Sequence, residues 1–95
     1  MVVTDTLEGI VDGMLWFHYD IGNDVLYIKV ASCRERPDVG EETPDGFIQL
    51  RDAETDRVVG MTVVNWWKRF GEGALPDSIA ELQRHIEPWA RRIAA

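Results

Sequence analysis

Two groups of oxygen-bearing side chains in this 95-residue chain have the types and spacing to do chemistry. They are Asp20, Asn23 and Asp24 in "YDIGND", and Asp52, Glu54 and Asp56 in "RDAETD". A hard cation such as calcium takes six to eight oxygen ligands, and neither group has the full spacing and distal glutamate of a calcium loop. The simpler interpretation is turn chemistry, in which an aspartate side chain accepts a backbone N–H two residues ahead. The sequence therefore predicts two tight turns and no metal site.

A nucleophile and a base are the next possibility. The chain has one cysteine, Cys33, and two histidines, His18 and His85. Arg34 and Arg36 lie close enough in sequence to lower the thiol pKa, but no residue can be named that would orient a base beside it. No phosphate-binding glycine loop, nucleophile elbow or zinc motif is present. We expect no catalytic residues and no cofactor, and a non-enzymatic role is favoured.

The segment "NWWKRF" (65–70) places aromatic side chains beside bases. Trp66 or Trp67 could stack on a single-stranded base while Lys68 and Arg69 met phosphate. The net charge of −7 opposes this, because nucleic-acid affinity rests on releasing counterions with basic side chains. We therefore favour a strand end whose tryptophan packs under a helix, and we expect no nucleic-acid partner.

Hydrophobic alternation predicts the elements that position these residues. Residues 14–20 and 24–30 alternate with period two around a turn that contains Gly22 and Asn23, which is typical of a β-hairpin. Residues 46–52 and 57–67 form a second strand pair, in which Gly60 indicates a bulge or a close approach of another backbone. The expected sheet is four-stranded and antiparallel, made of two hairpins.

The remaining segments are less regular. Residues 31–45 are polar and are expected to form a long surface loop or to contain a short edge strand near Val39. Residues 4–12 fit a helical turn or an extra strand equally well. The C-terminal segment 76–94 has an apolar stripe typical of an amphipathic helix, with Ser78 and Glu81 as a capping box and Asp77 as a rival cap. Pro88 is expected to kink this helix or to split it.

The predicted class is thus α+β, with one domain over residues 1–95, a β-sheet core at 14–66 and a helix at 76–94. One face of the sheet is expected to form the core under the helix: Leu15, Phe17, Tyr19, Leu26, Ile28, Val30, Ile48, Leu50, Val59, Met61 and Val63. The other face would then present Trp16, His18, Tyr27, Phe47, Val64 and Trp66. That face is too apolar to remain wet in a monomer, so we predict a homodimer interface there. The alternative is a cover made by the N-terminal segment or by a kinked helix.

The composition also indicates the cellular compartment in which the protein is expected. No apolar run reaches the roughly 18 residues of a membrane span, and the acidic N-terminus does not resemble a signal peptide. The single Cys33 cannot form an internal disulfide, which is typical of a reducing compartment. We expect a cytoplasmic protein without a membrane contact.

The segments "YDIGNDVLYIKV" and "DRVVGMTVV" resemble the domain of unknown function 2283 family of short bacterial proteins. The matching residues are Tyr19, Asp20, Asp24, Leu26, Tyr27 and Ile28, and then Asp56, Val58, Val59, Gly60 and Met61. The resemblance covers roughly residues 14–66. It implies a small β-rich fold with no established activity, and an antitoxin-like role, since some members appear beside small toxin-like genes.

Two functional hypotheses follow. The first is a domain that works through protein contacts, as a homodimer and as an antitoxin-like or regulatory partner of a basic protein. Its contact with that partner would be an acidic loop formed by Glu35, Asp38, Glu41 and Glu42, because complementary charge guides encounter. The alternative is small-molecule binding or catalysis in a cleft between sheet and helix, around Tyr19, Tyr27, His18 and Trp66.

Overall fold

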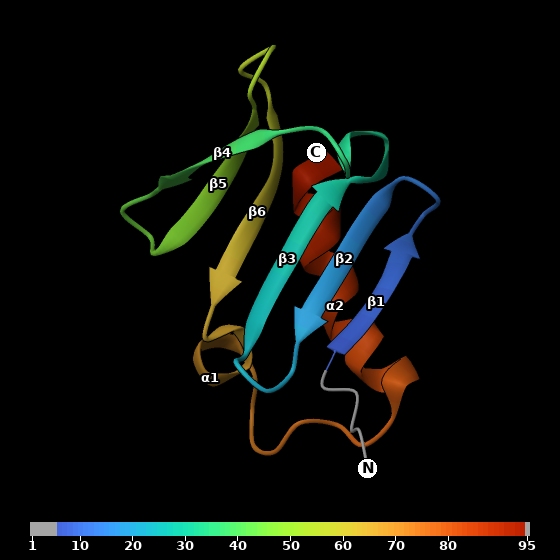
Figure 1. Cartoon of the computed structure of the whole chain (residues 1–95). Coiled ribbons are helices and arrows are strands. Elements are labelled where there is room, and N and C mark those ends of the chain that lie inside the picture. The colour runs from blue at the N-terminus through green and yellow to red at the C-terminus, as the bar shows by residue number, and fades with distance from the viewer. Residues whose placement is uncertain (1–5, 95) are drawn as a thin grey trace.

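Six strands form one antiparallel sheet in the computed structural model, which describes residues 6–94 (Figure 1). The strands are β1 (Thr6–Val11), β2 (Leu15–Asp20), β3 (Val25–Val30), β4 (Asp38–Glu42), β5 (Phe47–Asp52) and β6 (Val58–Val64). Their order across the sheet is β1-β2-β3-β6-β5-β4. The sheet therefore consists of two three-stranded meanders joined along β3 and β6.

The predicted α+β class and antiparallel sheet are confirmed, but the expected number of four strands is wrong. The two predicted hairpins correspond to β2–β3 and β5–β6, and the extra strands are the outer ones, β1 and β4. The strand alternatives for residues 4–12 and for the region near Val39 are thus confirmed within the described residues. Both strands lie at sheet edges. Because every residue of β4 is exposed, neither face of this strand has to be apolar, and its sequence shows no apolar alternation.

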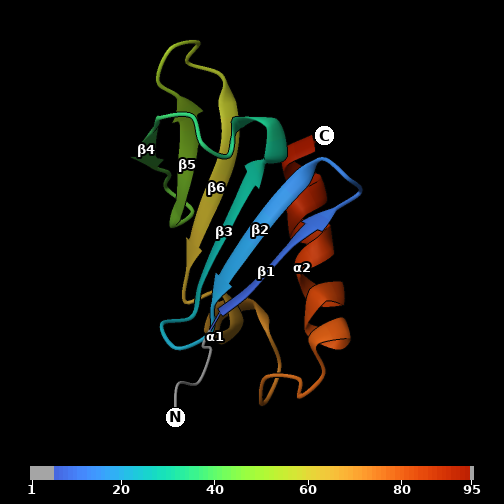
Figure 2. The same ribbon diagram turned by 45° about the vertical axis from the view of Figure 1, so that its right-hand side comes forward.

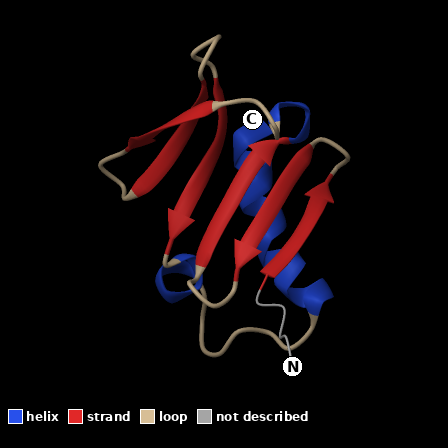
Figure 3. Cartoon of the chain, viewed as in Figure 1, coloured by secondary structure: helices blue, strands red, loops and turns tan. Residues whose placement is uncertain are grey.

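The chain leaves the sheet earlier than the predicted strand 57–67 implies. Asn65 has φ +56°, a left-handed conformation that ends the strand, and the short helix α1 (Trp66–Phe70) follows at once. A three-residue 3₁₀ turn, η1 (Ala31–Cys33), likewise turns the chain away after β3. Figure 3 distinguishes these helical segments from the strands.

The C-terminal helix α2 (Ile79–Ala94) continues through Pro88 as one element. Pro88 removes the hydrogen bond to the Arg84 carbonyl, but both residues are exposed, so water can solvate that carbonyl. At the start of α2 the Ser78 hydroxyl accepts the Glu81 backbone N–H at 3.4 Å, as the predicted cap requires. No helix in the described part of the chain is long and apolar enough to cross a membrane.

The core lies between α2 and one face of the sheet (Figure 2). Its members are buried residues of β1, β2, β3, β6, α1 and α2: Val11, Leu15, Phe17, Tyr19, Leu26, Ile28, Val63, Trp66, Leu82, Ile86 and Ala90. Burial of this apolar surface is the main stabilising contribution available to a domain of this size. One face of the sheet is thereby covered by α2.

Two of the predicted core residues lie on the wrong face. The pairing of β5 with β6 places Ile48 opposite Thr62 and Leu50 opposite Gly60, on the side away from α2. Alternation along β5 then turns Phe47 toward α2, where its ring contacts that of Trp89. A one-residue change in register exchanges the two faces of a strand. In β5 the difference in hydrophobicity between the two faces is too small to fix the register from the sequence of that strand alone.

Candidate functional site

The sheet surface opposite α2, which we call the open face, carries an apolar and aromatic patch that Thr62 and Gly60 of β6 interrupt. Its members are Ile10, Trp16, His18, Val25, Tyr27, Ile48, Leu50 and Val64, placed there by the strand registers. The Trp16 and His18 rings are 6.0 Å apart, and the His18 and Tyr27 rings are 5.9 Å apart. Tyr27 is 38% exposed at the middle of the patch. No described helix covers this face.

Charged side chains on β1 and after η1 hold Trp16 in place. The Trp16 indole N–H donates to Glu8 at 2.8 Å, Arg34 forms an ion pair with Glu8, and the Arg34 guanidinium lies 4.8 Å from the centre of the Trp16 ring. The Trp16 hydrogen bond, followed by His18 and Arg34, lowers the pKa of Glu8. The Glu8 and Arg34 charges offset each other, so this end of the patch is electrically neutral.

Four of the six predicted interface residues lie on the open face, namely Trp16, His18, Tyr27 and Val64. The placement of the other two, Phe47 and Trp66, is wrong. Phe47 faces α2 because of the β5 register, and Trp66 is 2% exposed because α1 carries it under the sheet, edge-on to Tyr19 at 5.0 Å. Ile10, Ile48 and Leu50 take their places on the patch.

The alternative cleft between sheet and helix does not form around the predicted residues. Tyr19 and Trp66 are buried core residues on the α2 side of the sheet, whereas His18 and Tyr27 lie on the open face. These four side chains are therefore separated by the sheet itself and cannot line one cleft.

The acidic loop is mostly strand β4, and two of its four acids already have partners. Lys29, only 5% exposed, donates to Asp38 at 2.6 Å and to the Arg36 carbonyl at 2.8 Å. Glu41 lies 3.7 Å from Arg51. A buried ammonium needs such partners, so Lys29 anchors the chain between η1 and β4 to the sheet. Of these four acids, Glu35 and Glu42 have no ion pair within residues 6–94.

Both aspartate groups form turns, which confirms the turn interpretation. Asp20 accepts the Asn23 backbone N–H at 3.1 Å, and Asp52 accepts that of Glu54 at 2.8 Å. Asp24 and Asp56 both adopt positive φ, Asp24 directly before β3 and Asp56 two residues before β6. Among residues 6–94 no group of three or more histidine, cysteine or acidic side chains is placed to hold a metal ion.

Asp24 has a role that its spacing did not reveal. Its carboxylate accepts the Tyr19 hydroxyl at 2.6 Å and the backbone N–H groups of Trp67 and Lys68 at 2.8 and 3.0 Å. It thereby ties the β2–β3 hairpin to the first turn of α1, more than forty residues away in sequence. Burial, and then the Asp24 hydrogen bond, raises the pKa of Tyr19, so the phenol stays protonated.

The segment "NWWKRF" is built into the fold through Trp66, Trp67 and Arg69. Trp66 is buried, and the Trp67 indole donates to the Gly73 carbonyl at 2.8 Å. Arg69 donates to the Asp45 carbonyl at 2.8 Å and lies over the Phe70 ring. Trp66 packs in the core with α2 as predicted, but it lies in helix α1 and not at a strand end, and Arg69 is engaged with protein and not simply solvated.

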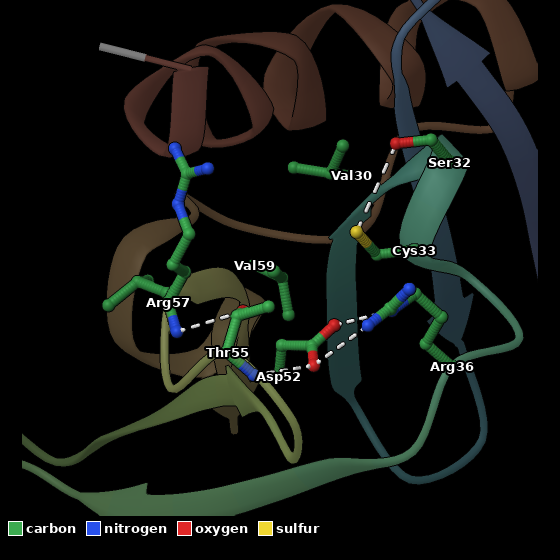
Figure 4. Close-up of a pocket in the computed structure, with 9 residues that line it drawn as sticks. Val30, Ser32, Cys33, Arg36, Asp52, Thr55, Arg57 and Val59 are labelled. Atoms are coloured by element: carbon green, nitrogen blue, oxygen red, sulfur yellow. Dashed lines mark hydrogen bonds and ion pairs between the residues drawn. The ribbon is translucent and has the colours of Figure 1, made fainter.

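A cavity of about 350 Å³ opens beside the β5–β6 turn, and none of the patch residues of the open face lines it (Figure 4). Its lining residues come from β3, η1, β5, β6 and the connections between them: Val30, Ser32, Cys33, Arg36, Asp52, Thr55, Arg57, Val58 and Val59. Figure 4 shows Ser32, Cys33 and Arg36 on one side and Thr55 and Arg57 on the other, with Val30 and Val59 between them. Cys33 is a candidate from the sequence alone, but no local pattern connects it with Arg57.

Asp52 and Arg36 form the wall of this cavity. Arg36 donates to the Asp52 carboxylate at 2.6 and 3.2 Å and to Glu54 at 3.0 Å, and Asp52 is 4% exposed. The Arg36 hydrogen bond, supported by the backbone N–H groups of Glu54 and Thr55, holds the pKa of Asp52 far below its usual range. Asp52 therefore remains ionised at any ordinary pH.

This ion pair predicts a loss of stability in acid. A carboxylate whose pKa is lowered on folding contributes stability above its unfolded pKa of roughly 3.9, and the contribution is lost as the pH falls further. We expect the urea midpoint of the wild type to fall steeply below pH 4. The Asp52→Asn variant should be less stable at pH 7, and its urea midpoint should fall by a smaller amount over the same pH interval. Parallel profiles for the two proteins between pH 7 and pH 2 would contradict this assignment.

Comparison of this chain with protein-family models, with curated proteins and with solved structures found no match in any of the three. The resemblance of residues 14–66 to the domain of unknown function 2283 family thus stays a prediction.

Proposed function

We propose that this chain is a protein-binding domain without catalytic activity, and that it forms a two-fold homodimer through the open face. The single observation that carries the proposal is the aromatic and apolar patch on the side of the sheet opposite α2. A sheet with apolar residues on both faces needs a layer on each side, and the described chain supplies only one.

The composition of the open face favours a second copy as the cover. Interface centres are enriched in aromatic side chains and depleted of unpaired charge. Trp16, His18 and Tyr27 give the patch an aromatic centre, and the neighbouring Glu8 and Arg34 are paired with each other. A two-fold contact places the patch of one copy against the same patch of the other copy. Because Glu8 and Arg34 pair within each copy, their charges do not repel the same residues of the second copy, although the chain has a net charge of −7.

A basic partner protein has weaker support. Two of the four acids in the proposed contact are held by Lys29 and Arg51, which leaves Glu35 and Glu42 for a partner. The antitoxin-like role is therefore a prediction from the sequence to which the described geometry adds little.

The homodimer is tested by a charge placed at the centre of the patch. The wild type should have twice the monomer mass in light scattering at micromolar concentration. Tyr27→Asp should raise the dissociation constant of the dimer by at least about thirtyfold, since two buried like charges would face each other and a central aromatic contact would be lost.

The matched control is Val39→Asp. Val39 is an apolar β4 residue, 59% exposed, and its pairing with Arg51 places it away from the open face. This variant should remain dimeric. A monomeric wild type, or equal dissociation of the two variants, would exclude the open face as the interface.

A further inference from the structure

The cavity beside the β5–β6 turn has one cationic side chain that the fold does not use. Arg36 is engaged by both Asp52 and Glu54, so this wall carries two carboxylates for one guanidinium. The Arg57 guanidinium, in contrast, has no hydrogen bond or ion pair within residues 6–94. Only its backbone is bonded within that range: the Arg57 N–H donates to the Thr55 hydroxyl at 3.4 Å, and the Arg57 carbonyl accepts the Asp52 N–H at 2.8 Å. The cavity thus carries the positive charge of Arg57 at its rim.

The floor of the cavity is apolar. Val30 and Val59 lie between the two polar walls, and Val58 joins them in the lining (Figure 4). Val59 belongs to the rigid sheet and is buried, while Val30 ends β3 directly before η1. A ligand would therefore meet branched aliphatic side chains below it, with Ser32 and Thr55 hydroxyls at the sides.

We propose that this cavity binds a small aliphatic monocarboxylate, with the carboxylate on Arg57 and the hydrocarbon chain on the valines. A guanidinium binds a carboxylate with two parallel charge-assisted hydrogen bonds. A volume of about 350 Å³ lies at the lower end of the range for ligand pockets, which suits a short branched chain. This site is separate from the open face and does not depend on the proposed homodimer.

The surrounding charges argue against other ligand classes. A cation would be repelled by Arg57 and would find Asp52 already held by Arg36. A phosphate dianion would bring two charges to one available guanidinium and would leave the valine floor without apolar contact. A single negative charge on an aliphatic chain satisfies both features.

Cys33 supplies a reporter for this site, because it lines the cavity and is the only cysteine in the chain. The experiment measures the rate of Cys33 alkylation by iodoacetamide on the full-length protein, with and without sodium isovalerate. Isovaleramide, of the same shape but uncharged, and sodium chloride at equal ionic strength are the controls. A ligand of this size should bind with a dissociation constant on the order of 1 mM. At about ten times that concentration the rate should fall roughly tenfold, as mass action requires.

Two variants test the role of Arg57. Arg57→Gln should weaken protection by isovalerate at least about tenfold, since a hydrogen-bonded charge is lost. Arg84→Gln removes the same charge from an exposed position on α2 and should leave protection unchanged. The ratio of rates with and without ligand is compared within each variant, so a change in intrinsic thiol reactivity cancels.

Several results would overturn the proposal. They are an unchanged alkylation rate with isovalerate at about fifty times the expected dissociation constant, equal protection by isovaleramide or chloride, and full protection retained in Arg57→Gln. Equal protection by inorganic phosphate would replace the carboxylate class with a general anion site and would also reject the inference. None of these results alters the expected mass of the dimer.

Discussion

Replacing Gly60 by alanine should lower the free energy of unfolding by about 3 kcal/mol or more. Gly60 lies in β6 between Lys29 and Leu50, and a Cβ atom there would lie 2.3 Å from the Ile28 carbonyl oxygen and 3.1 Å from the Lys29 Cα. Both are backbone atoms of β3 and cannot rotate away, so the strands would have to separate. Urea unfolding followed by circular dichroism measures the change.

Gly40→Ala is the matched control for this substitution. Gly40 lies in the edge strand β4, and its added Cβ would meet a side-chain atom, the Ile48 Cγ2, at 3.0 Å. A small rotation or shift relieves such a contact, and we expect a cost below about 1 kcal/mol. Equal costs for the two variants would contradict the close approach of β3 and β6.

Asp24→Ala should lower the free energy of unfolding by about 2–4 kcal/mol. The change removes the acceptor of the Tyr19 hydroxyl, which would leave a polar group unsatisfied beside the core at a cost of about 1–3 kcal/mol. It also removes the cap of α1, which contributes about 1 kcal/mol in typical helices. Thermal unfolding, with tyrosine and tryptophan fluorescence as the signal, measures the loss.

Asp56→Ala separates these hydrogen bonds from the backbone effect. Asp56 has φ +61°, close to the +56° of Asp24, so alanine meets the same left-handed strain at both positions. Within the described residues the Asp56 side chain accepts no hydrogen bond. The difference between the two variants therefore reports the Asp24 contacts alone, and a difference near zero would remove Asp24 from its structural role.

The sequence predicted the two central hairpins because their signals are local. Period-two alternation and the turn residues Asp20 and Asp52 act within a few positions of each strand. Strands β1 and β4 lacked such a signal, since Gly9 interrupts the first and exposed acidic residues fill the second. Edge strands of this kind are defined by the neighbour with which they pair, and a single sequence does not display that neighbour.

The open face was predicted only in part, because some of its residues follow from local patterns and others depend on pairing between distant strands. Trp16, His18 and Tyr27 follow from alternation within one hairpin, but Phe47 depends on the register between β5 and β6. The position of Trp66 depends on a single residue, Asn65, whose positive φ ends the strand before Trp66. The Arg57 cavity brings together η1 and the β5–β6 turn, which are more than twenty residues apart, and no local pattern indicates that contact.

The joining of two meanders along β3 and β6 also determines how the chain can fold. Each hairpin pairs residues close in sequence, whereas β3 and β6 join Lys29 to Gly60 and Val25 to Val64, which are 31 and 39 positions apart. Closure of a long loop precedes that pairing, so it is the slow step. Until it occurs, both meanders present an unpaired strand edge rich in apolar residues, chiefly valine, to other molecules. The risk of aggregation therefore belongs to this brief stage of folding, and in the finished protein the acidic β4 protects its own edge.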